Sequence, residues 1–208
     1  MPLIKYNNQS LSSITALPSA IPTGKLKLIS SQTASNSASI SFTTGLNSTY
    51  KIYKFVFVNM KSSNAQNIEM NFSTDGGSNY NVTKTTTTFV GEHSEDDSSV
   101  ARIAYSDGYD IAQGTGYQII FNINKGGLDS GADASASGEM TLFNPASTTY
   151  VKHFLGRFNS MSEYPGSTDN YVAGYCNTTS AVNAVRFRVV NSTGNISGTI
   201  YLYAIDNS

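Results

Sequence analysis

The chain has 208 residues and a mass of 22.3 kDa, which suits one domain with an arm. Ser, Thr and Asn number 30, 21 and 20, about a third of the chain, whereas charged residues are only 13%, roughly half the usual share. This composition excludes a helical bundle and a disordered tail, and no apolar run approaches the ~20 residues of a membrane span. The formal net charge is −1, which argues against nucleic acid as a partner. The densest basic pairs are interpreted as parts of solvated strand faces; they are Lys25 with Lys27, and Arg186 with Arg188.

The N-terminal segment differs in composition from the rest of the chain. It holds Pro2, Pro18 and Pro22 among Ser, Asn and short apolar residues, so it can neither propagate a helix nor sit inside a sheet. We therefore expect residues 1–24 to form an extended arm and residues 25–208 to form one domain. The first residues also lack the apolar core of a signal peptide, which predicts a protein that is made and kept in a cytoplasm.

Cys176 is the single cysteine of the chain, so no intrachain disulfide can form. The domain must then fold on core area or on contacts between subunits. Because Cys176 follows an apolar stretch and neither His is close in sequence, we expect a buried structural thiol.

Segments that alternate with a period of two follow one another from residue 25 to the end, and none has a helical period. The regular spacing of short strands and turns predicts an all-β domain, an antiparallel β-sandwich or jelly roll. Thr, Ser and Asn at outward strand positions account for the neutral polar composition. The expected strands are 25–29, 37–43, 50–60, 67–74, 80–90, 100–105, 117–124, 137–144, 149–158, 171–176, 182–190 and 196–205.

Two strand pairings are expected. Residues Asp75–Gly77 supply the positive φ of a tight turn, so we predict a hairpin between residues 67–74 and 80–90. Residues 50–60 are apolar on both faces in their middle, which is typical of a central strand that is buried on both sides or covered by a neighbour. The closing segment 196–205 is expected to pair with this central strand, since first and last strands of a sandwich often meet.

Two acidic segments are candidate cation sites. The denser one, residues 92–97, carries four carboxylates and an imidazole, which could hold Ca²⁺ or a similar hard ion. Its order lacks the spacing of an EF-hand loop, so a solvated loop tip is the favoured interpretation, with no metal and no cofactor. The second candidate has glycine beside aspartate, which indicates a turn first. Its carboxylates are Asp107, Asp110, Asp129 and Asp133.

No catalytic motif is present: the chain lacks G-x-S-x-G, H-E-x-x-H and a Walker-type glycine loop. Glu69, Glu139 and Glu163 lie on or next to expected strands, but nothing pairs them across a cleft as glycoside hydrolysis requires. A catalytic triad that uses His153 with Cys176 or a Ser is the remaining alternative. A histidine whose hydrogen bonds serve only the structure of its strand is far commoner than a catalytic one. We therefore expect no enzyme and no catalytic residue.

Tyrosines stand two or three apart on the expected strands, as Tyr50 with Tyr53 and Tyr201 with Tyr203. Exposed rows of this kind stack on sugar rings or anchor protein interfaces. The simpler interpretation is that these rings cap the edges of the core.

The closing segment ISGTIYLYAI, residues 196–205, resembles the last strand of short β-sandwich virion structural proteins of tailed bacteriophages, especially those of marine and cyanobacterial hosts. The segments FVNM at 57–60 and STDGGSNY at 73–80, and the Met-Pro-Leu start, are similar to segments of the same group. The resemblance spans most of residues 40–208, and Ala204 stands where Gly is frequent. It implies a virion protein without catalytic residues.

Under this resemblance the expected function is a capsid decoration or cement protein, assembled in the host cytoplasm, that bridges neighbouring virion subunits through its arm and a sheet face. The expected partners are other capsid or tail proteins and further copies of the chain. A trimer is one form that such a homo-oligomer could take. The alternative is a tail or fibre component, or a receptor-binding module that recognises host surface glycans. That module would show a row of exposed Tyr beside Asn and Asp in a groove at the loop end.

Overall fold

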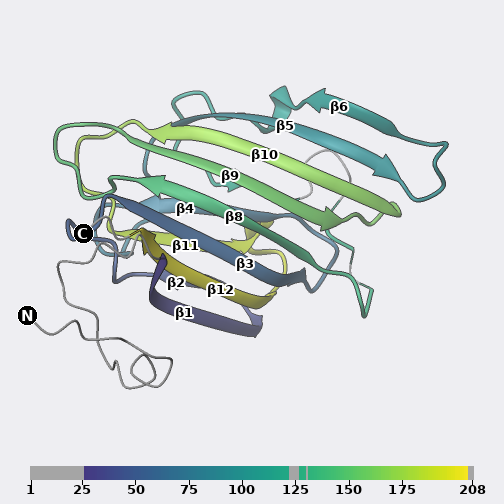
Figure 1. The fold of residues 1–208 in the computed structure, drawn as a ribbon, viewed down its shortest axis with the longest axis horizontal. Coiled ribbons are helices and arrows are strands. Elements are labelled where there is room, and N and C mark those ends of the chain that lie inside the picture. Colours follow the sequence, from purple (N-terminus) through teal and green to yellow (C-terminus); the bar gives the residue numbers. More distant parts are fainter. Residues whose placement is uncertain (1–25, 122–126, 130, 206–208) are drawn as a thin grey trace, which may run out of the picture.

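The computed structural model of the protein describes residues 26–121, 127–129 and 131–205. Its strands form two antiparallel sheets that pack face to face (Figure 1). The predicted β-sandwich is therefore confirmed, whereas a jelly-roll order of strands is not. The expected arm, residues 1–24, lies outside the described residues.

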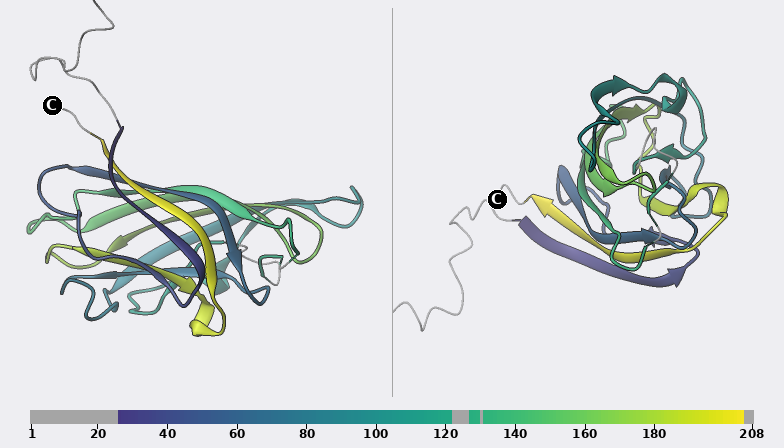
Figure 2. Two further views of the ribbon diagram at one scale, coloured as in Figure 1. Left: turned by 90° about the horizontal axis from the view of Figure 1, so that it is seen from below. Right: turned by 90° about the vertical axis from the view of Figure 1, so that its right-hand side faces the viewer.

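The larger sheet has eight strands. They are β1 (Leu26–Ser37), β3 (Ile52–Ser62), β5 (Lys84–Ser94), β6 (Ala101–Tyr105), β8 (Ala136–Phe143), β9 (Lys152–Met161), β10 (Gly166–Cys176) and β12 (Ile196–Ile205). Their order across the sheet is β1-β12-β3-β8-β9-β10-β5-β6, so β1 and β6 are its edges. Figure 1 shows these two edges on opposite sides of the molecule, and Figure 2 shows the paired ends of β1 and β12 projecting from the body.

The smaller sheet has four strands in the order β2-β11-β4-β7. They are β2 (Ile40–Phe42), β4 (Ile68–Ser73), β7 (Gln118–Ile119) and β11 (Ala184–Val189). Two single-turn 3₁₀ helices, η1 (Asp107–Tyr109) and η2 (Val190–Ser192), complete the described elements. In the described part of the chain no helix has the length and apolar character needed to cross a membrane.

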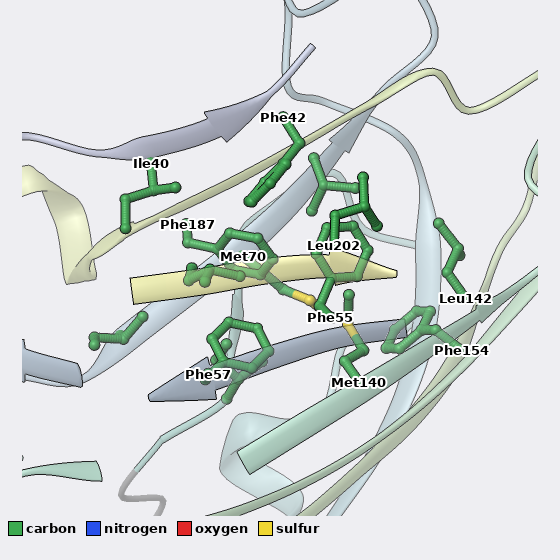
Figure 3. Close-up of a cluster of buried hydrophobic side chains, with 14 of the residues drawn as sticks. Ile40, Phe42, Phe55, Phe57, Met70, Met140, Leu142, Phe154, Phe187 and Leu202 are labelled. Carbon is green, nitrogen blue, oxygen red and sulfur yellow. The ribbon is translucent and has the colours of Figure 1, made fainter. Parts of the chain in front are cut away.

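Aromatic side chains on the inward faces hold the two sheets together (Figure 3). Phe55 and Phe57 of β3 meet Phe187 of β11 edge to face, with ring centroids 5.7 and 5.0 Å apart. Phe42 of β2 lies 5.4 Å from Phe55. All four rings are buried, and each buried Phe contributes about 1.5–3 kcal/mol relative to an exposed one. The apolar positions whose alternation predicted these strands are therefore the positions that fill the core.

The predicted partner of the central strand is confirmed. β12 pairs with β3 over most of its length, and β1 pairs with the other side of β12. The inward residues of β3, such as Tyr53, are fully buried, but the outward residues Ile52, Lys54 and Val56 are only half-buried. The expectation that β3 is buried on both sides is therefore wrong, because its outward face belongs to an open side of the sandwich.

The predicted hairpin between residues 67–74 and 80–90 is wrong. β4 pairs with β11 and β7 in the small sheet, and β5 pairs with β10 and β6 in the large one. The turn itself is present, with φ of 73° at Gly76 and 93° at Gly77. The turn leads the chain from β4 in the small sheet to β5 in the large one. The outward side chain of Asn71 donates to the Tyr80 carbonyl at 2.7 Å and so holds the crossing segment over β4.

The outer face of the small sheet is covered by two segments of the chain itself, residues 74–83 and 115–117, which we call the covering segments. Every residue of β4 is buried as a result. Arg186 and Arg188 of β11 stack on rings of the covering segments, 3.9 Å from the Tyr80 centroid and 3.7 Å from that of Tyr117. These two arginines were expected on a solvated strand face, and that expectation is wrong because the covering segments lie over them.

Candidate functional site

In the part of the chain that the structure describes, no segment lies over the middle of the outer face of the large sheet, which points away from the small sheet. Directly opposed residues of antiparallel strands stand side by side on one face, so the register defines rows that run across the strands. One row crosses all eight strands, and we call it the central row. It consists of Tyr105, Phe89, Tyr171, Arg157, Glu139, Val56, Tyr201 and Ser31.

The aromatic half of the central row is a layered stack. The rings of Phe89 and Tyr171 are parallel within 5° and their centroids lie 4.5 Å apart. The guanidinium of Arg157 covers Tyr171 at 5.1 Å from the ring centroid. Arg157 is fixed in turn by Asp169, which accepts from its Nε and Nη2 at 3.0 and 2.7 Å and from the Tyr171 hydroxyl at 3.1 Å. Contacts between side chains of neighbouring strands therefore fix the orientation of the rings and the guanidinium in the stack.

A hollow lies beside this stack because the next row is made of smaller residues. Thr87, Ala173, Leu155 and Thr141 form its floor, and the stack forms one wall. Its volume is about 400 Å³. A second hollow of about 300 Å³, bounded by His153 and Tyr175, shares Thr87, Leu155 and Ala173 with the first. We call the two together the trough.

The charges at the trough are paired with one another. Glu139 accepts from Lys54 Nζ at 2.7 Å, and Arg157 forms its ion pair with Asp169 at 2.7 Å. The hydrogen bonds from Arg157 to Asp169, followed by their mutual attraction, raise the pKa of Arg157 above its ordinary value. The site is therefore amphipathic and locally neutral, with exposed apolar area at Leu155, of which 55% is accessible.

The acidic segment 92–97 is only partly the expected loop. β5 continues to Ser94, and Glu92 points inward from it with its side chain buried. Arg102 of the neighbouring strand donates to Glu92 Oε2 at 2.7 Å. The solvated-tip interpretation is wrong for Glu92, because the strand that contains it turns this side chain toward the interior.

The remaining residues of this segment bind one another. His93 Nε2 lies 3.1 Å from Asp97, and Asp96 accepts from Ser98 and Ser99 at the turn, which lowers the pKa of Asp96 to about 2, chiefly through Ser99. Among the described residues, no group of three or more His, Cys, Asp or Glu side chains could hold a metal ion. Asp96 is therefore a turn-capping residue.

The second acidic candidate is also dispersed. Asp107 begins η1, and Asp110 accepts from the Thr88 hydroxyl at 3.0 Å. Asp129 accepts from the Gly131 amide at 2.8 Å, as in an Asx turn. Asp129 therefore caps a turn of the backbone, in agreement with the turn interpretation, whereas Asp110 binds a side chain of β5.

The possible pairing of His153 with Cys176 is contradicted by the strands. His153 is exposed on the outer face, whereas Cys176 is buried on the inner face beside its strand partners Lys84 and Lys152. Burial raises the pKa of the Cys176 thiol to about 12, so it stays protonated. The predicted structural thiol is confirmed.

The three glutamates considered for glycoside hydrolysis lie apart. Glu69 is on the outer side of β4, paired with Arg188 at 2.7 Å, whereas Glu139 is on the outer face of the opposite sheet. Glu163 is exposed in the turn between β9 and β10. No two of these carboxylates face each other across a cleft.

The tyrosines divide between the two interpretations. Tyr53 is fully buried, its hydroxyl donates to the Asn47 carbonyl at 3.0 Å, and Tyr50 meets it edge to face at 6.2 Å. These two rings cap the core. Tyr201 and Tyr203 instead stack on the outer face with centroids 6.2 Å apart.

Sequence reasoning missed the central row. Phe89, Tyr171 and Arg157 lie far apart along the chain, and only the register of β5, β10 and β9 aligns them. The available signal was the outward placement of Phe89 and Leu155 within their strands. Comparison of the chain with protein-family models, with curated proteins and with solved structures finds no match.

Proposed function

We propose that the protein is a structural component of a tailed-bacteriophage virion that bridges neighbouring subunits through the outer face of its large sheet. One observation supports a broad contact surface. In the described part of the chain, every exposed large apolar side chain that lies on a strand belongs to the outer face of the large sheet. These residues are Leu26, Leu28, Val58, Phe89, Ile103, Tyr105 and Leu155.

Exposed apolar side chains gathered on one face are typical of a surface that docks on another protein. The edge strand β1 adds to this surface, because among the described strands it pairs with β12 on one side, and the edge of a sheet can accept a further strand. The tips of β1 and β12 project from the body (Figure 2) and carry Leu26 and Leu28, each about half exposed. Both features suit contacts with neighbouring subunits, including further copies of the chain in a trimer.

The virion assignment itself comes from the resemblance of residues 40–208 to phage β-sandwich proteins. Capsid decoration is the proposed location, because a broad neutral face and a projecting strand pair suit bridging on a repetitive shell. A tail or fibre location is the second candidate, and the trough on the outer face favours it if it binds a receptor. The proposed role is geometric, so no enzymatic step and no cofactor is included.

The test is to measure the location and copy number of the chain in purified particles by quantitative mass spectrometry and cryo-electron microscopy. Hundreds of copies on the shell are expected for decoration, and a few tens at the tail would move the assignment to a fibre part. Absence from the particle would overturn the virion role.

Two variants test whether incorporation into particles depends on the outer face of the large sheet. Ile103→Lys places a charge in the exposed apolar face and should reduce incorporation into particles, since Ile103 is 83% exposed and contributes little to folding. Thr74→Lys, an exposed site on the covered side, is the matched control. Equal incorporation of the two variants would contradict docking through the large sheet.

A further inference from the structure

We propose that the trough on the outer face of the large sheet is a binding site for a neutral, linear saccharide chain. This inference goes beyond the virion role and does not depend on it. It gives the glycan alternative a definite place, which is a sheet face and not the loop end where a sugar site was expected.

The shape of the trough suits an extended ligand. Its floor takes one residue from each of four adjacent strands, Thr87, Ala173, Leu155 and Thr141, so it runs across the strands. Three strand spacings correspond to about 14 Å, long enough for a short oligosaccharide. The second hollow shares Thr87, Ala173 and Leu155 with the first and lies one row further along the strands, so it widens the trough.

The lining matches the two sides of a sugar ring. Leu155 and the aromatic stack of Phe89 and Tyr171 offer apolar contact for C–H faces, and Phe89 is 41% exposed. Hydroxyls of Thr87 and Thr141 line the same hollow as the Arg157 guanidinium. Arg157 uses Nε and Nη2 on Asp169, so of its five N–H donors those of Nη1 are available to ligand hydroxyls.

The charge of the site favours a neutral ligand over an acidic one. Both charged groups that line the hollow are already in ion pairs, Glu139 with Lys54 and Arg157 with Asp169. An acidic polysaccharide would have to compete with Asp169 for Arg157. A neutral chain can use the same groups as hydrogen-bond partners without breaking either pair.

The backbone under the trough argues against an extended peptide as the occupant. Each of the four strands beneath it, β5, β10, β9 and β8, is paired with a neighbour on both sides. A peptide lying across them would find no row of unpaired N–H and C=O groups to continue as a sheet. A saccharide needs only side-chain partners, which the trough supplies.

The experiment uses the purified full-length chain and an array of dextran, mannan, galactan, alginate and pectate, with affinities measured by calorimetry for fragments of each polysaccharide that binds. We expect binding to at least one of the three neutral polymers. Ala173→Arg, which fills the floor, and Tyr171→Ala, which removes the stack, should each weaken it at least tenfold.

Tyr201→Ala is the matched control, because Tyr201 lies on the same face and in the central row but outside the trough. It should leave the affinity unchanged, and circular dichroism of all three variants checks that each is folded. Three outcomes overturn the proposal: no binding to a neutral polymer, binding to the acidic polymers alone, or full affinity in folded Ala173→Arg. None of them bears on whether the chain is found in particles.

Discussion

The two outer faces of the sandwich are built in opposite ways. On the small sheet, the covering segments lie over Asn71, Arg186 and Arg188, and the polar side chains of the strands bind them. On the large sheet the side chains of the central row are partly open to solvent, and Arg157, for example, binds Asp169 on the same face.

The difference teaches that polarity alone does not tell which face of a β-sandwich is open. On the covered face Asn71 satisfies backbone carbonyls of the segments above it, and Arg186 and Arg188 stack on their tyrosine rings. The open face carries Phe, Tyr, Ile and Leu, although water reaches it. Residues on the covered face should therefore matter for stability, and residues on the open face for binding.

The largest effect is expected at Asn71. Its fully buried amide donates to the carbonyls of Tyr80 and Thr115 at 2.7 and 2.9 Å, one in each covering segment. Asn71→Ala leaves both acceptors without this partner and should lower the free energy of unfolding by about 3 kcal/mol. Urea denaturation measures it, and Thr87→Ala on the open face should change it by less than about 0.5 kcal/mol. Equal effects would contradict the comparison.

The second effect concerns Lys84, whose Nζ donates to the carbonyls of Val82 and Gly116 at 3.0 and 2.6 Å. Burial lowers the pKa of Lys84 from 10.5 to about 8. Below about pH 8 the ammonium is charged in both states and its burial cost is fully present. Between about pH 8 and 10.5 the unfolded chain binds more protons at this group, so Lys84 by itself should raise the free energy of unfolding by on the order of 3 kcal/mol. The pKa of Cys176, raised from 9.0 to about 12, acts in the opposite direction above about pH 9.

This rise is measured by urea denaturation across the pH window. Lys84→Met should remove most of it. Burial also lowers the pKa of Lys152, so a smaller rise with the same sign should remain until Lys152 is replaced as well. The same pH dependence in Lys84→Met and in the unchanged protein would show that water reaches Lys84.

A smaller effect is expected from the arginine–tyrosine stacks. Arg186→Ala removes the guanidinium that lies 3.9 Å from the Tyr80 ring and should cost about 1–2 kcal/mol, because this stack is desolvated. Arg157→Ala removes the looser stack on Tyr171, at 5.1 Å and open to solvent, and should cost clearly less. Thermal denaturation of both variants tests the order, and the reverse order would mean that the open face is covered in solution.

The smallest effect on stability is expected at Phe89. Phe89→Ala loses a half-exposed ring and its stack on Tyr171, which together should change the free energy of unfolding by about 1 kcal/mol or less. The same change should reduce self-association in sedimentation experiments, since it removes apolar area from the open face. A large loss of stability would show that the ring belongs to the core.

Alternation identified the strands that separate an apolar inward face from a polar outward one. The residues of β3, β4 and β12 were predicted in this way, with ends within a few positions of those observed. The second half of β9 and the first half of β10 were missed. Their inward positions are polar, with Ser160 and Thr168 sharing a 2.6 Å hydrogen bond and Asn170 donating to a strand carbonyl. A strand that is polar on both faces has no alternation to detect.

The candidate site was less predictable than the fold for a different reason. The face on which Phe89 and Tyr171 lie follows from their strands, but their contact depends on register. A shift by one residue would place them on opposite faces, and the sequence contains no short turn that fixes β5 against β10. The hairpin error has the same origin, because a glycine turn after β4 fixes the direction of the chain and not its next partner.

The position of β12 has a consequence for how the chain folds. The last strand lies between β1 and β3, so β1 cannot join the large sheet until residues 196–205 have been synthesised. β11 likewise lies between β2 and β4 and completes the small sheet late in synthesis. Contacts that close over such long stretches of sequence form slowly. Folding of both sheets therefore waits for residues 184–205, and until then β1 and β3 each present an edge to other chains.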